Sequence, residues 1–131
     1  MAIETSAVVA LLNSEPEAET FESAVAADPV RLVAATCVFE ARMVLVSRRG
    51  VPAIGEIDLW FAKAGVQISP VDFDLADLAT QAWLTFGKGR HGAALNFAAC
   101  FSYAPARRSG EPLLFKGDDV SKTDVRRDSA A

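Results

Sequence analysis

Short apolar segments alternate with helix-like segments along this chain, and that alternation restricts the fold more than any other feature. The strand-like segments cover residues 1–3, 31–35, 66–69 and 112–115. Each is brief and mostly apolar, as strands are when helices cover both faces of a sheet. Alternating strands and helices are typical of a parallel sheet between helical layers. We therefore expect an α/β fold with a mainly parallel sheet.

Helical periodicity, capping residues and breakers predict the segments between the strands. Helices are expected over residues 7–12, 16–26, 37–49, 53–64, 72–86 and 95–108. Thr5 or Ser6 is expected to cap the first helix and Thr36 the third. Pro105 should kink the last helix or end it early, because proline cannot continue the hydrogen-bond ladder. A short edge strand is expected over residues 120–125.

The chain has 131 residues, enough for one domain with a real core and too few for two ordinary domains. We expect the domain to span residues 1–125 and a flexible, solvated tail to follow over residues 126–131. Because no apolar run reaches the length of a membrane helix, we expect a cytoplasmic protein without membrane contact. Cys37 and Cys100 lack metal-site spacing and are expected to be buried in a reducing compartment.

Acidic residues follow three of the predicted strands. Glu4 comes after residues 1–3, Glu40 lies near the start of the helix after residues 31–35, and Asp118 and Asp119 follow residues 112–115. Functional groups collect at the carboxyl ends of parallel strands, and carboxylates gathered there repel one another unless a cation holds them. Mg²⁺ and Mn²⁺ accept such oxygen ligands. Simpler explanations remain open, because Glu40 could serve the helix dipole and the aspartates could be turn residues.

Three stretches of the chain, which lie between residues 2 and 125, read AIETSAVVALLNSEPEAETF, VFEARMVLVSRRG and FGKGRHGAALNFAACFSYAPARRSGEPLLFKGDDVSKTDV. They resemble PIN-domain ribonucleases, specifically VapC-type toxins of bacterial toxin–antitoxin pairs, and the resemblance extends along nearly the whole chain. The resemblance implies a three-layer α/β/α PIN domain, an acidic Mg²⁺ or Mn²⁺ site and endonucleolytic cleavage of RNA. It also implies a VapB-type antitoxin in a type II toxin–antitoxin pair, and a homodimer.

The resemblance also assigns roles to individual residues. Glu4 stands where the family has its first metal-binding aspartate, and Glu40 matches the family's glutamate. Ser6 matches a small hydroxyl residue beside the metal. Asp119 matches the acid of the motif after the last strand, with the adjacent Asp118 as the other candidate. Ala99 stands where the family pattern LNFGDC has a metal-binding aspartate, because this chain reads LNFAAC.

Ala99 limits how far the activity can be carried over. It removes a charge and two possible oxygen ligands, and Mg²⁺ demands near-octahedral geometry. Our hypothesis is therefore a PIN fold that is a metal-dependent endoribonuclease with a compromised site. The alternative is an inactive PIN-domain binding module that engages antitoxin or RNA without cleaving. A nucleotide-phosphate domain is a more distant alternative, and the missing glycine-rich nucleotide loop counts against it.

Two further features have open interpretations. Lys88, Arg90 and His91 lie in a glycine-flanked loop, which is either an RNA phosphate contact or an ordinary solvated loop. The resemblance favours the RNA contact. The apolar helical residues near Phe21 and residues 60–61 supply either a dimer or antitoxin surface or part of the chain's own core, and periodicity does not choose between them.

Overall fold

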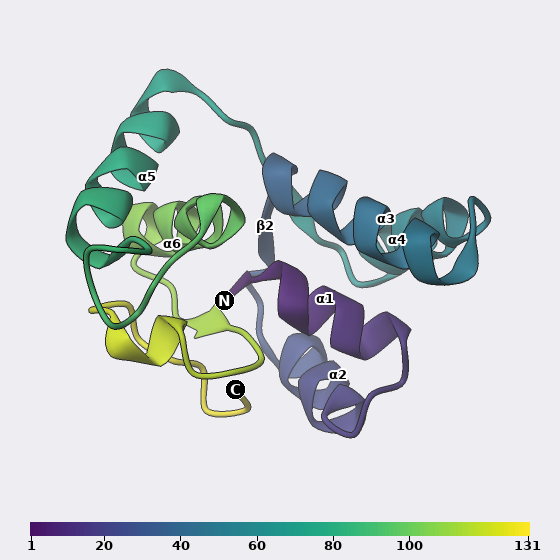
Figure 1. The fold of residues 1–131 in the computed structure, drawn as a ribbon. Helices are drawn as coiled ribbons and strands as arrows, with labels where there is room; N and C mark the ends of the chain where they lie inside the picture. The colour runs from purple at the N-terminus through teal and green to yellow at the C-terminus, as the bar shows by residue number, and fades with distance from the viewer.

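A four-stranded parallel sheet lies at the centre of the computed structural model, which describes residues 1–131 (Figure 1). Its strands are β1 (Ala2–Ile3), β2 (Leu32–Ala34), β3 (Gln67–Ser69) and β4 (Leu113–Leu114). Their order is β3-β2-β1-β4, and every neighbouring pair is parallel. The expected parallel α/β fold is confirmed. β1 is central, so the residues that follow it lie between the ends of β2 and β4.

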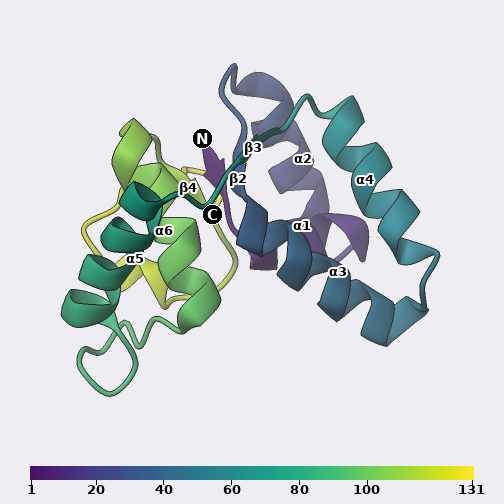
Figure 2. The same ribbon diagram turned by 90° about the horizontal axis from the view of Figure 1, so that it is seen from above.

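Helices cover both faces of the sheet, which gives the three layers seen in Figure 2. One layer holds α1 (Thr5–Leu12), α2 (Ala18–Ala27), α3 (Ala35–Arg49) and α4 (Ala53–Lys63). The other holds α5 (Phe73–Phe86) and α6 (Phe97–Ser109), with the short 3₁₀ helix η1 (Val120–Lys122) nearby. None of these helices has the length and apolar character that crossing a membrane requires.

Alternation along the strands divides the buried side chains into two cores. Ile3 and Leu114 belong to the core beneath α1–α4, whereas Ala2 and Leu113 belong to the core beneath α5 and α6. Successive side chains of a strand point to opposite faces, so even two-residue strands contribute to both cores. Phe21 and Phe61 are buried in the first core and Trp60 packs partly against it. The core interpretation of these aromatic residues is therefore the one that holds in the monomer.

Two expected helix caps are wrong. The side chain that caps α1 is Glu4, which accepts a hydrogen bond from the Ser6 amide, and not Thr5 or Ser6. The carboxylate reaches this amide because Glu4 has extended backbone angles directly before the helix. Likewise α3 begins at Ala35 without a side-chain cap, so Thr36 lies inside the helix.

The C-terminal third differs from expectation in three places. α6 continues past Pro105 to Ser109, because the flanking Ala104 and Ala106 are buried in the second core and packing holds the helix. Residues 120–125 form η1 and turns rather than an edge strand, since Val120 is buried in that core. The backbone beside β4 belongs instead to residues 126–128.

The segment expected to be a solvated tail packs on the domain. The Leu113 amide donates to the Arg126 carbonyl at 2.9 Å, and the Asp128 amide donates to the Leu113 carbonyl at 3.0 Å. Ala130 and Ala131 are partly buried against the cores. Residues 126–131 therefore pack on the domain, which does not end at residue 125 as expected.

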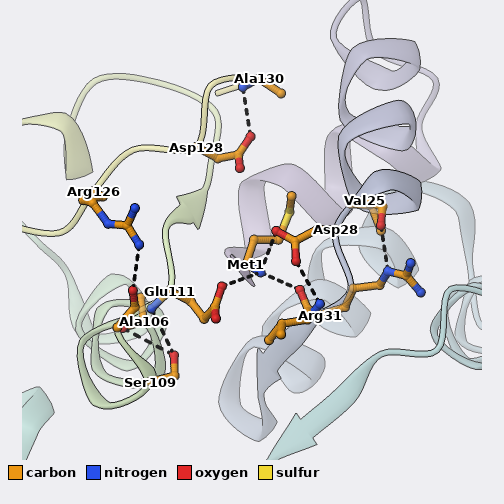
Figure 3. A network of polar contacts seen from close by, with 12 residues as sticks. Met1, Val25, Asp28, Arg31, Ala106, Ser109, Glu111, Arg126, Asp128 and Ala130 are labelled. Carbon is orange, nitrogen blue, oxygen red and sulfur yellow. Dashed lines mark hydrogen bonds and ion pairs between the residues drawn. The ribbon is translucent and has the colours of Figure 1, made fainter.

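Polar contacts tie the loops together below the amino ends of the strands (Figure 3). The Met1 amino group lies 3.0 Å from carboxylate oxygens of both Asp28 and Glu111. The Arg31 guanidinium donates three hydrogen bonds: to the carbonyls of Val25 at 2.7 Å, Ala64 at 2.8 Å and Ala26 at 3.1 Å. Arg31 thus satisfies backbone carbonyls at the ends of two helices, α2 and α4, that flank β2.

We expect Arg31→Ala to lower the free energy of unfolding by about 1–3 kcal/mol, because hydrogen bonds from a charged donor are lost and helix-end carbonyls lose their partner. Urea denaturation measures this change. Arg126→Ala is the matched control, since its exposed guanidinium donates a single hydrogen bond, to the Gly110 carbonyl. Equal losses of stability in the two variants would contradict the structural role of Arg31.

Candidate active site

A pocket of about 370 Å³ opens at the carboxyl ends of β1 and β4, between α3 and the start of α6. We call it the acidic pocket. Its polar and charged lining residues are Glu4, Thr5, Ser6, Glu15, Glu40, Arg48, Asn96, Lys116 and Asp119, and its apolar lining residues are Val9, Val44, Ala99, Phe115 and Val120. The parallel sheet accounts for this gathering, because the ends of neighbouring parallel strands meet at one edge.

Glu4 lies in the turn where the central strand β1 passes into α1. Its carboxylate accepts hydrogen bonds from the Ser6 amide at 2.6 Å and from the Ser6 hydroxyl. Burial raises the pKa of the Glu4 carboxyl; the hydrogen bonds from Ser6 oppose this rise, and the charge of Asp119 adds to it. Glu4 is therefore a carboxylate held in a fixed orientation by a helix N-terminus.

Glu40 approaches the same space from the second turn of α3. Burial is the main cause that raises the pKa of its carboxyl, and the negative charge of Glu4 is the next. One of its carboxylate oxygens, Oε2, is buried without a hydrogen-bond partner, as is Oγ1 of the pocket residue Thr5. Thr5 nevertheless lies close enough to Glu40 to oppose the rise of its pKa, so the cost of burying these two oxygens is partly offset, and a cation or water would satisfy them further.

The structure distinguishes between the two aspartates that follow β4. Asp119 lines the acidic pocket, and its charge acts on Glu4. Asp118 is exposed and does not line the pocket, and its carbonyl accepts a hydrogen bond from Ser121. Of the two neighbouring aspartates, Asp119 is therefore the one that lines the pocket together with Glu4.

Ala99 contributes a methyl group where the pocket meets α6. The Asn96 side chain caps this helix by accepting a hydrogen bond from the Ala99 amide at 2.9 Å, which fixes Ala99 in the first turn. No three His, Cys, Asp or Glu side chains come close enough together to hold a metal ion. Glu4, Glu40 and Asp119 alone therefore do not complete a metal site, and position 99 is where the lining lacks a donor.

Sequence reasoning missed Glu15, Asn96 and Lys116, and it did not place Arg48 in this pocket. Lys116 comes two residues after the end of β4, so the strand-end rule could have found it. Its amide donates to the Ser6 hydroxyl at 2.9 Å, which links the ends of the two strands. Glu15 and Arg48 lie far from any strand end, and only the packing of α1 against α3 brings them to the pocket.

The basic loop lies apart from the acidic pocket. Lys88 lines a separate, mostly apolar cavity beside α5 and α6. The Arg90 guanidinium stacks over the Trp83 ring at 4.3 Å, and Nδ1 of His91 accepts a hydrogen bond from the Ala93 amide at 3.0 Å. None of the three side chains predicted to contact RNA lines the pocket that holds the acids.

We expect Glu40→Gln to stabilise the chain more at about pH 8 than at about pH 5. A carboxyl whose pKa is raised in the folded state binds its proton more tightly there than in the unfolded state. As the pH rises above 4.5, the ordinary pKa of a glutamate carboxyl, Glu40 therefore lowers the free energy of unfolding. Urea midpoints at the two pH values measure the difference.

The matched control is Glu19→Gln, an exposed glutamate in the first turn of α2. Its urea midpoint should shift equally at both pH values. A Glu40→Gln variant that behaved like this control would contradict the raised pKa of the Glu40 carboxyl.

Comparison with known proteins agrees with this geometry. Residues 1–126 match the PIN domain family. Ribonuclease VapC30 of Mycobacterium tuberculosis is 50% identical over 125 residues, which cover 95% of each chain. Ribonuclease VapC of Mycolicibacterium smegmatis is 51% identical over 125 residues, covering 95% of this chain and 97% of the relative.

A solved structure shares the fold at a lower identity. The sarcin–ricin-loop-cleaving toxin VapC20 of Mycobacterium tuberculosis has a TM-score of 0.76 and 23% identity, and the match covers 94% of each chain. At that identity the likeness concerns the fold alone. The family match over residues 1–126 and the relatives at about half identity over nearly their full length are decisive. The chain belongs to the PIN domain family, and within it to the VapC-type toxins.

Proposed function

We propose that this chain is the endoribonuclease toxin of a type II toxin–antitoxin pair, with catalytic power reduced by Ala99. The observation that carries the proposal is the acidic pocket, in which Glu4, Glu40 and Asp119 converge from three separate elements. The relatives named ribonuclease VapC support the same reaction class, hydrolysis of RNA. The reduced activity rests on the methyl group at position 99.

Mg²⁺ or Mn²⁺ is the cofactor we propose for this pocket. Glu4, Glu40 and Asp119 are the carboxylates that would contact the ion, although in the free chain they do not come close enough together to hold it, and the unpartnered Oε2 of Glu40 would be available as an oxygen ligand. Ser6 orients the Glu4 carboxylate from beside it. Because this set is incomplete, it would hold the ion weakly and would not fix the attacking water in place, and poor positioning of reacting groups costs orders of magnitude in rate.

The proposed partners follow from the family. A VapB-type antitoxin would cover the acidic pocket, RNA would be the substrate, and two copies of the chain would form a homodimer in the cytoplasm. Lys88, Arg90 and His91 would meet RNA outside the acidic pocket, because their loop lies beside α5. The second candidate function is a binding module that engages antitoxin or RNA without cleaving. The incomplete donor set around Ala99 is the observation that favours it.

Restoring the missing donor should strengthen metal binding. For the double variant Glu4→Asp, Ala99→Asp we expect Mn²⁺ affinity at least about tenfold above that of the unmodified chain. Losing a residue that only hydrogen-bonds a metal ligand already lowers metal affinity by about 10–100-fold, so restoring a direct ligand should have at least a comparable effect. Titration calorimetry with Mn²⁺ measures the affinity. Cleavage of a single-stranded RNA should rise by about 10²-fold in the same variant.

Ala98→Asp is the control for this experiment. It adds the same carboxylate to the same turn of α6, but Ala98 lines a neighbouring apolar cavity rather than the acidic pocket. It should leave Mn²⁺ affinity and RNA cleavage unchanged. Tight Mn²⁺ binding by the unmodified chain would overturn the incomplete-site proposal.

Expression without an antitoxin separates the nuclease from the binding module. We expect the unmodified chain to slow bacterial growth measurably, and Asp119→Asn to abolish that effect because it removes a pocket carboxylate. Asp118→Asn should retain it, since this exposed neighbour lies outside the pocket. Growth curves after induction give the readout. Harmless expression of both the unmodified chain and the double variant would favour the binding module.

A further inference from the structure

Two cationic side chains line the acidic pocket at its rim, and neither belongs to the basic loop. Lys116 lies two residues after the end of β4, and Arg48 lies in the last turn of α3. Their side chains are 38% and 54% exposed, so both are within reach of a ligand in solvent. The backbone of Lys116 is fixed by its hydrogen bond to Ser6, which in turn holds the Glu4 carboxylate. This places a cation at a defined position beside the acids.

Glu15 joins these two cations. Its carboxylate lies 2.6 Å from Nζ of Lys116 and 3.5 Å from Nη1 of Arg48. Glu17 lies 3.1 Å from the same Lys116 ammonium. A carboxylate between a lysine and an arginine occupies the position that any other oxyanion of similar size would prefer.

RNA faces an electrostatic obstacle at this pocket. The chain carries a net charge of −4, and Glu4, Glu40 and Asp119 repel a phosphate that approaches them. Association with a polyanion then requires cations close to the reacting position. The cations of the basic loop do not line the pocket, whereas Lys116 and Arg48 do.

We propose that Lys116 and Arg48 bind a backbone phosphate of RNA at the mouth of the acidic pocket, in the place that Glu15 occupies in the free chain. This inference rests on the proposed function and adds to it the residues that position the substrate. The guanidinium of Arg48 offers paired donors to the phosphate oxygens, and Lys116 supplies a point charge. Glu15 keeps both side chains oriented in the absence of RNA and competes with the phosphate.

The test measures RNA binding separately from cleavage. A fluorescent single-stranded RNA oligonucleotide is titrated with the protein in EDTA, and anisotropy gives the dissociation constant over a series of salt concentrations. We expect Lys116→Ala and Arg48→Ala each to weaken binding by about threefold to tenfold, and each to reduce the slope of log K against log salt by about 0.7 per lost phosphate contact. Lys116→Arg, which keeps the charge, should restore most of the affinity.

Two matched controls remove a cation elsewhere. Arg49→Ala removes the cation next to Arg48 in the sequence. Arg49 pairs with Glu56 at 2.8 Å and does not line the pocket. Lys63→Ala removes the lysine at the end of α4, outside the pocket. Both should retain the dissociation constant and the salt slope of the unmodified chain. Lys116→Ala and Arg48→Ala variants that match these controls would overturn the inference.

Glu15→Gln gives a change in the opposite direction. Removing the competing carboxylate should tighten RNA binding by about threefold to tenfold, because the two cations lose an internal anion. A purely structural Glu15 would instead lower the urea midpoint and leave RNA affinity unchanged or weaker, which would overturn its competing role. If the unmodified chain binds no RNA, the proposed function fails with this inference. If it binds RNA and the variants bind equally well, only the inference fails.

Discussion

The parallel pairing of β1 with both β2 and β4 is the constraint on which the rest of this structure depends. β1 has only two residues, and its neighbours are nearly as short, so the sheet contributes few hydrogen bonds of its own. The contribution of the sheet is to fix the positions of the residues that follow its strands. With β1 central, Glu4 lies between the start of α3 and the turn after β4. A strand shifted by one residue would turn Glu4 to the other face and exchange Ala2 with Ile3 between the two cores.

Placing carboxylates at one edge costs stability. Burial raises the pKa values of Glu4 and Glu40, the charge of Asp119 adds to the rise at Glu4 and the charge of Glu4 adds to the rise at Glu40, and the Oε2 atom of Glu40 is buried without a partner. Two large cores offset this cost, one under α1–α4 and one under α5 and α6. The pocket is therefore a strained site supported by a well-packed scaffold, which is typical of functional sites.

The sequence predicts the fold well because the strands and helices depend on local patterns. Short apolar runs, helical periodicity and caps such as Asp72 identify nearly every element. Predictions fail where tertiary packing decides, as at Pro105, which stays helical within a buried helix, and at Val120, which joins a core rather than a strand. In the candidate site, the strand-end acids Glu4 and Asp119 are accessible to sequence reasoning. Glu15 is not accessible in this way, and neither is the position of Arg48 beside it, because only contacts between helices distant in sequence bring the two together.

Ala99 has a consequence for stability as well as for metal binding. An aspartate in its place would add a further carboxylate to a pocket where Glu4 and Glu40 already repel each other, and would raise both of their pKa values further. Alanine removes that repulsion, so the chain folds at a lower electrostatic cost when no cation is bound. The same exchange reduces the negative charge that RNA meets at the pocket. Because Lys116 and Arg48 remain at the rim, the balance at this edge shifts from holding a cation toward holding a phosphate, which separates RNA binding from RNA cleavage within one site.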